Sequence, residues 1–242
     1  SSSGGAALIV SGECDMGIGS DQGGSVRMPS SWSGCVGIKP THGLVPYTGA
    51  GPIEHSIDHL GPMAGSSLDC ALLLEVIAGY DDGRDPRQVG SLPAKPYGEL
   101  VTQGIEGLRI GIVEEGFGTP SSESDVDEAV NVAARRLIEA GAVVEDVSIP
   151  VHGRAMPIMF ASSLDGTLST WGDQGPAGPN PGGYYPLSAI QFYQQARKTR
   201  AGDLPDMAKT GMLFAHVMRA RYGNYYSAKA QNLLRPIRAQ YD

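Results

Sequence analysis

The hydrophobic pattern in the middle of the chain predicts a strand, a helix and a second strand. Residues 108–113 (LRIGIV) and 142–149 (AVVEDVSI) are short segments rich in β-branched and other aliphatic residues, and each predicts a strand. Between them, residues 124–140 place Val126, Val130, Ala133 and Leu137 at helical spacing, with acidic residues in the first turn and Gly141 after the last. This order is typical of two parallel strands covered by a helix, and it indicates an α/β fold.

The first 80 residues have shorter apolar segments, each interrupted by glycine or proline. We expect a loop and helix over residues 1–12 and short strands over 14–19 and 36–38. A helix over residues 66–78 is predicted to begin with Ser66 and Asp69 as a capping box, with Leu68, Leu72 and Val76 along one face. Residues 81–107 are polar and rich in turn residues, and they predict a surface connection.

Residues beyond 172 differ in composition from those before. Residues 173–186 hold four glycines and four prolines, which predicts a linker or long loop. Residues 187–242 then carry nine Lys or Arg against three Asp, a net charge of +6, and predict two or three helices. Their aromatic residues fit either an RNA- or partner-binding pair of helices or a helical cap with a solvated basic face. We favour the cap, because aromatic residues at helical spacing more often pack than stack on bases.

Composition limits the class of protein. The 242 residues, 41% of them hydrophobic, suffice for one large or two small domains, and 34 glycines indicate many tight loops. No apolar run of 18 residues and no signal peptide is visible, so no membrane span is predicted. The net charge of −8 argues against a general nucleic-acid binder. Cys14, Cys35 and Cys70 have no metal-ligand spacing and are interpreted as small buried residues in a reducing compartment, which predicts a cytoplasmic location.

The candidate chemistry lies in the glycine-rich run from Gly17 to Ser31. Ser25 follows two glycines, whose backbone can adopt conformations that point successive N–H groups at one spot. The N–H groups of Gln22, Gly23, Gly24 and Ser25 could therefore form an oxyanion pocket beside a serine nucleophile. A plain turn or a phosphate-binding loop are the alternatives. The dinucleotide fingerprint, the Walker loop and the G-x-S-x-G elbow do not match.

Four motifs in one order make the interpretation specific. SSSGGAALIVSG begins at Ser1, and DQGGSVR, GCVGIKPT and IDHLGPM follow at Asp21, Gly34 and Ile57. Together they closely resemble the amidase signature family, densely over about the first 80 residues. The resemblance implies an α/β fold with a mixed, mostly parallel central sheet, helices on both faces and a helical cap. Residues 1–172 would belong to the catalytic core, 173–186 to the loop and 187–242 to the cap. Since the chain begins inside a motif, we expect it to be incomplete at both ends.

The resemblance also implies a Ser–cis-Ser–Lys triad. Ser25 corresponds to the nucleophile, and an ungapped count of 24 positions back reaches Ser1 as the bridging serine, with Ser2 as the alternative. The family's bridging serine sits at a cis peptide bond. The family's lysine lies upstream of that serine, so it is not among these 242 residues. Lys39 belongs to the Gly-x-Lys-Pro-Thr motif and is interpreted as structural.

Other polar residues near these motifs have more ordinary interpretations. Asp21 and Arg27 flank the loop, and we expect them to brace it. His55 and His59 are four residues apart, but the sequence between them does not match a zinc motif, so no metal is predicted. His59 belongs to the Asp-His-x-Gly-Pro-Met motif, which we expect to form a loop packed near the nucleophile.

The predicted function is therefore hydrolysis of a carboxamide to a carboxylate and ammonia through a serine acyl-enzyme, without cofactor or metal. The amino-acid sequences of these motifs are most similar to those of bacterial amidases that act on small aliphatic or aromatic amides. The expected partner is therefore a small-molecule amide. Neither nucleic acid nor membrane is expected, and a homodimer is left open. Two alternatives remain: the glutamine-hydrolysing subunit of a tRNA-dependent amidotransferase, and a non-catalytic amidase-like binding domain.

Overall fold

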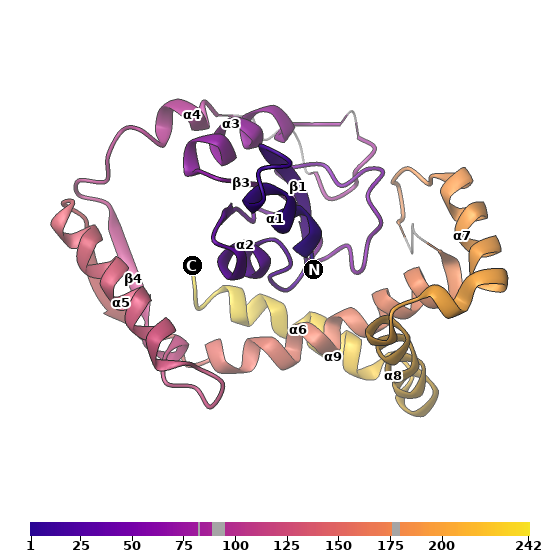
Figure 1. Cartoon of the computed structure of the whole chain (residues 1–242). Coiled ribbons are helices and arrows are strands. Elements are labelled where there is room, and N and C mark those ends of the chain that lie inside the picture. Colours follow the sequence, from indigo (N-terminus) through magenta and orange to yellow (C-terminus); the bar gives the residue numbers. More distant parts are fainter. Residues whose placement is uncertain (82, 89–94, 176–179) are drawn as a thin grey trace. The chain divides into compact units, whose positions relative to one another are not determined.

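The computed structural model describes residues 1–81, 83–88, 95–175 and 180–242, and it combines helices with two small sheets (Figure 1). This mixture confirms the predicted α/β class. The chain divides into two compact units, residues 1–101 with 162–227 and residues 102–161 with 228–242, each with its own sheet. The boundaries of these units differ from the boundaries predicted for the core, the loop and the cap. The assignment of residues to core, loop and cap stays a prediction.

The sheet of the first unit has three antiparallel strands in the order β1–β3–β2. The strands are β1 (Met16–Asp21), β2 (Val36–Gly37) and β3 (His59–Ala64). Met16 pairs with Ala64 and Asp21 pairs with His59, so the end of β1 lies against the start of β3. The Asp-His-x-Gly-Pro-Met motif is therefore largely a strand, and the predicted loop is wrong from His59 onward.

Close packing in this sheet depends on glycine at the centre of β3. A Cβ on Gly61 would overlap the carbonyl oxygen of Ile38 and lie 3.2 Å from Pro40. The segment after β2 can approach β3 only because Gly61 has no side chain, and Ile38 N donates to Pro62 O there at 3.0 Å.

Two small clusters of buried residues stabilise the first unit. In one, α1 (Ser3–Val10) contributes Ala6 and Ile9, which pack with Val26 and Met63. In the other, Leu74 of α3 (Ser67–Ile77) packs with Leu44 and Val45.

Ser66 accepts a hydrogen bond from Asp69 N at 3.1 Å and so caps α3, as predicted. However, the predicted apolar face of this helix lies outward: Leu68, Leu72 and Val76 are exposed. Cys70 and Leu74, which lie four residues apart on another face, are buried instead. The prediction of buried cysteines holds for Cys70 but is wrong for Cys14, which is exposed, because it lies in the turn before β1.

Helices make up the rest of the first unit. They are α2 (Arg27–Ser33), α4 (Tyr97–Leu100), the end of α6 (His152–Thr167), the π-helix η2 (Leu168–Gln174), α7 (Leu187–Arg200), η3 (Ala201–Asp203), α8 (Asp206–Tyr222) and the start of α9 (Tyr225–Arg238). Arg219 of α8 joins three of these segments, since it pairs with Asp165 at 2.9 Å and with Asp173 at 3.1 Å. The helices predicted beyond residue 187 are confirmed. Of the predicted loop 173–186, the first two residues belong to η2, and residues 176–179 lie outside the described residues.

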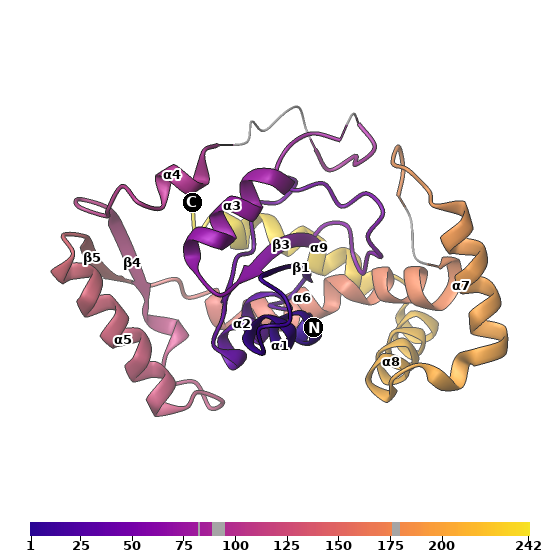
Figure 2. The same cartoon turned by 45° about the horizontal axis from the view of Figure 1, so that its top comes forward.

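The second unit contains the strand, helix and strand that the periodicity predicts (Figure 2). The parallel strands β4 (Arg109–Val113) and β5 (Val143–Val147) are joined through the short helix η1 (Glu114–Gly116) and α5 (Ser124–Glu139). No residue of α5 is fully buried.

Among the described residues, one of the three strand pairings is parallel and two are antiparallel. In the described part of the chain the strand pairings are thus mostly antiparallel, whereas the resemblance implies a mostly parallel central sheet. None of the described helices is long and apolar enough to cross a membrane.

Candidate active site

The loop that carries Ser25 is built around the buried carboxylate of Asp21, the last residue of β1. Its two oxygens accept the backbone N–H of Gly24 at 2.7 Å, of Val26 at 3.2 Å and of Arg27 at 3.3 Å. The Arg27 guanidinium also donates to both oxygens, each at 2.9 Å. Burial alone would raise the pKa of Asp21, but the hydrogen bonds from Arg27 and from Gly24 N–H outweigh it and lower the pKa to about 2. The predicted brace between Asp21 and Arg27 is confirmed.

Ser25 lies at the turn between this loop and α2 and is half-buried. The preceding Gly24 has φ of +114°, a conformation that residues with a side chain rarely adopt. A Cβ there would also lie 2.9 Å from the Met28 side chain. Glycine is thus required for the turn that presents Ser25.

The predicted oxyanion donors divide into two groups. Gly24 N–H points to Asp21, so its assignment to the oxyanion pocket is corrected: the carboxylate already occupies this donor. Among the hydrogen bonds of the described residues, none takes the N–H of Gln22, Gly23 or Ser25. These three groups are available for a developing oxyanion beside the Ser25 hydroxyl.

The upstream serine that contacts this region is Ser2. Its backbone N–H donates to Ser25 O at 2.8 Å, and its hydroxyl bonds the backbone of Ser20 in β1, accepting from N at 3.1 Å and donating to O at 3.3 Å. Ser2 stands at the N-cap position of α1, yet its hydroxyl makes no capping bond. The Ser2 hydroxyl is instead hydrogen bonded to the backbone of β1.

Ser1, the residue predicted by an ungapped count, is exposed and its hydroxyl bonds only that of Ser3 among the described residues. This geometry favours the alternative, Ser2, because only Ser2 is paired with the Ser25 backbone. No cis peptide bond occurs among the described residues, so the cis bond that the resemblance implies is not found at either serine.

Lys39 contacts a histidine and, among the described residues, hydrogen bonds no serine. Its Nζ donates to Pro40 O at 3.1 Å and contacts His59 Nε2 at 3.3 Å. Burial and the nearby Arg27 charge lower the pKa of Lys39. Burial and Lys39 in turn lower the pKa of His59 to about 4, so His59 is neutral at pH 7 and Nε2 can accept the Lys39 proton while Nδ1 donates to Ile57 O at 2.7 Å. These contacts agree with a structural role for Lys39.

A second group of buried polar residues, not anticipated from the sequence, adjoins the loop. The Gln22 side chain donates to the hydroxyl of Tyr47 at 3.0 Å and lies close to the carboxylate of Asp58, whose pKa it lowers. Asp58 is fully buried and also accepts from the backbone N–H of Ile53 and Glu54 at 3.0 and 3.1 Å. In the sequence, the one feature that could have indicated this polar group was the position of Asp58 within the Asp-His-x-Gly-Pro-Met motif.

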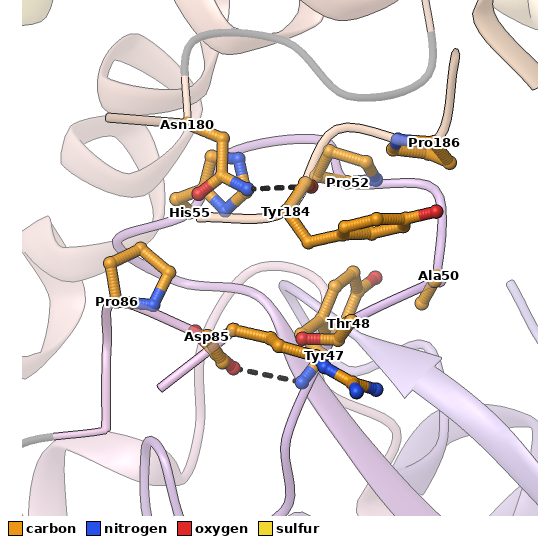
Figure 3. A pocket seen from close by; sticks show the side chains of 12 residues that line it. Tyr47, Thr48, Ala50, Pro52, His55, Asp85, Pro86, Asn180, Tyr184 and Pro186 are labelled. Atoms are coloured by element: carbon orange, nitrogen blue, oxygen red, sulfur yellow. Dashed lines mark hydrogen bonds between the residues drawn. The ribbon is translucent and has the colours of Figure 1, made fainter. Parts of the chain in front are cut away.

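Tyr47 also forms the floor of a cavity of about 20 Å³, shown in Figure 3, which has room for a single water molecule. Backbone N of Tyr47 donates to the Asp85 carboxylate at 2.8 Å below this cavity. Asn180, Tyr184 and Pro186 close its other side. Tyr47 is thus fixed between the loop and a small polar cavity. No group of three or more His, Cys, Asp or Glu side chains in the described part of the chain is placed to hold a metal ion.

Comparison with known proteins gives a consistent result. The family model described as Amidase matches residues 1–242. An enantioselective amidase of Rhodococcus rhodochrous is 40% identical over 243 residues, which cover all of this chain and 46% of that protein. The A-type subunit of a glutamyl-tRNA(Gln) amidotransferase from a Synechococcus strain is 33% identical over 248 residues, covering all of this chain and 49% of that protein. The chain spans about half the length of the curated relatives it matches.

Among solved structures, the native peptide amidase of Stenotrophomonas maltophilia is similar with a TM-score of 0.65 and 29% identity. That similarity covers 88% of this chain and 43% of the peptide amidase chain.

Proposed function

Because the chain belongs to the amidase family, we propose that the protein hydrolyses a carboxamide to a carboxylate and ammonia, with Ser25 as the nucleophile. One observation carries the proposal: Ser25 follows a loop whose backbone is fixed by Asp21 and whose N–H groups at Gln22, Gly23 and Ser25 are available. A half-buried serine beside such donors has what acyl transfer requires.

In the proposed reaction, Ser25 Oγ attacks the amide carbonyl carbon, and the N–H groups stabilise the negative charge on the carbonyl oxygen. The hydroxyl proton passes through Ser2 to a base and then to the leaving nitrogen, so that the C–N bond breaks and ammonia departs. Water then cleaves the resulting ester by the same proton path. The base is the lysine that the family resemblance places upstream of the bridging serine, since Lys39 is hydrogen bonded to His59.

The test is ammonia release from a panel of simple aliphatic and aromatic amides by the complete protein. Ser25→Ala is expected to abolish release and labelling by a fluorophosphonate probe. Ser31→Ala, an exposed serine of α2, should leave both unchanged. Release that persists in Ser25→Ala would contradict the assignment of the nucleophile, and an inactive, unlabelled wild-type protein would favour a non-catalytic binding domain.

A second candidate function is supported by the 33% identity to the amidotransferase subunit. Under this alternative the substrate is glutamine, and ammonia release would require partner subunits. Activity on simple amides by the isolated protein would favour the first proposal, whereas release from glutamine only in the presence of such subunits would favour the second.

A cytoplasmic location is proposed as well, because all three cysteines are free thiols, as in a reducing compartment.

A further inference from the structure

Gln22 carries the only side chain that can anchor the loop between Asp21 and Ser25. Gly23 and Gly24 have none, and Asp21 bonds the backbone only from Gly24 onward. The conformation at Gln22 and Gly23, the first two available oxyanion donors, therefore depends on where the Gln22 amide is held.

The holding groups are Tyr47 and Asp58. The amide nitrogen of Gln22 donates to the Tyr47 hydroxyl at 3.0 Å, and the side chain also lies close to the Asp58 carboxylate, whose pKa it lowers. The Ser20 hydroxyl lies close to the same phenol group, so Tyr47 meets side chains on both sides of Asp21. A single buried phenol thus connects the end of β1 with the first residue of the loop.

Tyr47 is itself immobilised by strong contacts. It is only 4% exposed, its backbone N–H is bound by Asp85, and its ring lies 4.8 Å from the guanidinium carbon of Arg87. Arg87 pairs with Asp85 and donates to the carbonyl oxygen of Asp58 at 2.7 Å. One buried arginine therefore fixes both residues that hold Gln22. Figure 3 shows the bond between Asp85 and the Tyr47 backbone.

The phenol acts here as an orienting group rather than as an acid or base. Burial and the Asp58 charge raise the pKa of Tyr47 well above its usual value, so the hydroxyl stays protonated at neutral pH. Its proton can be donated to Gly51 O at 3.4 Å while the oxygen accepts from Gln22.

We propose that Tyr47 is a positioning residue of the reaction: its hydroxyl holds the Gln22 side chain and thereby aims the N–H groups of Gln22 and Gly23 at the oxyanion. The proposal rests on the proposed amide hydrolysis. Donors that are fixed before the reaction stabilise the transition state more than the bound substrate. Loss of the hydroxyl should therefore lower kcat and leave KM nearly unchanged.

The experiment compares Tyr47→Phe with wild type in the complete protein, using the amide that is hydrolysed best. The phenylalanine ring keeps the packing, the contact with Arg87 and the backbone bond to Asp85. We expect kcat to fall about 10- to 100-fold, with KM within about twofold. An aldehyde analogue of the substrate, which forms a tetrahedral adduct with Ser25, should lose affinity by a similar factor. Tyr184→Phe is the matched control, because Tyr184 lines the same cavity but is exposed, and its kcat should equal that of wild type.

A second variant, Gln22→Met, tests whether Tyr47 acts through Gln22. If it does, the double variant Tyr47→Phe/Gln22→Met should be no slower than the slower single variant, because both changes release the same anchor. Independent, multiplying effects in the double variant would overturn the proposal, as would an unchanged kcat in Tyr47→Phe or a change in KM alone. Fluorophosphonate labelling of Ser25 distinguishes failure of the proposed amide hydrolysis from failure of the proposed role of Tyr47. If wild type is not labelled, the amidase function is refuted. If wild type is labelled and Tyr47→Phe hydrolyses the amide at the wild-type rate, only the role of Tyr47 is refuted.

Discussion

The sheet of β1, β2 and β3 and the pair β4 and β5 are both small, yet they are stabilised in different ways. Around β1, buried polar groups each make several bonds: the carboxylate of Asp21 binds three backbone N–H groups and one guanidinium. Around β4 and β5, helix α5 buries no residue fully, and its Val126 and Val130 are about half exposed.

The difference follows from what each region must do. A half-buried helix on a parallel pair needs only a periodic apolar stripe, and many sequences satisfy that requirement. A loop that presents backbone N–H groups to an oxyanion, as proposed for the loop before Ser25, must hold them in one arrangement. Unpaired buried polar groups are costly, so its interactions are specific and leave little tolerance for substitution. The following predictions test this contrast.

The largest effect is expected for alanine in place of glycine in the two units. Gly61→Ala should lower the free energy of unfolding by about 3 kcal/mol, because the new methyl group overlaps the backbone oxygen of Ile38, which cannot move without disturbing the sheet. Gly153→Ala, near the start of α6 in the second unit, meets no atom within 4 Å and should raise stability by up to about 1 kcal/mol. Urea unfolding measures both changes, and equal effects would contradict the contrast.

The loss of folding stability at low pH should arise more from the first unit than from the second. The pKa of Asp21 is about 2 in the folded protein, against 3.8 for an unperturbed aspartate, so the unfolded chain binds more protons between these values. Its contribution, about 2 kcal/mol, is present above pH 4 and is lost as the pH falls toward 2. The stability difference between wild type and Asp21→Asn should therefore shrink over this range. Asp127→Asn, in the first turn of α5, is the comparison: hydrogen bonds from Ser122 and Gly118 N–H also lower the pKa of this half-buried carboxylate. No arginine in the described part of the chain pairs with it, so the profile should change in the same direction and by less.

The smallest effect concerns the first turns of two helices. Ser66 caps α3 with its hydroxyl, whereas Glu123 occupies the same position before α5 and makes no side-chain capping bond. Ser66→Ala should cost about 1 kcal/mol, and Glu123→Ser should stabilise its unit by about 0.5 kcal/mol. Thermal unfolding followed by circular dichroism would show shifts of opposite sign. Two shifts of the same sign would show that α5 already has its N–H groups satisfied by other means.

The sequence predicted those features that depend on neighbours in the chain. Periodicity was enough for β4, α5 and β5, and the six-residue spacing of Asp21 and Arg27 was enough for their brace. The strand β3 was missed because Gly61 and Pro62 normally argue against a central strand, and only the close approach of Ile38 explains the glycine.

Features that depend on distant contacts were not predictable. Gln22 meets Tyr47 across 25 positions, and nothing local to either residue indicates that contact. The choice between Ser1 and Ser2 depends on the register between α1 and β1, which a count of residues fixes only to within one position. The catalytic roles of Ser25, Ser2 and Gln22 stay predictions.

The pairing of Asp21 with His59 also has a consequence for how the site forms during synthesis. The strand before Ser25 leaves the ribosome 38 positions ahead of the residue that pairs with its end, and β3 is the central strand of the sheet. At about 5–20 residues per second, roughly 2–8 s pass before pairing can begin. During that interval the glycine-rich loop has neither its partner strand nor Tyr47 and Asp58 in place, so the nascent chain carries Ser25 without an assembled site.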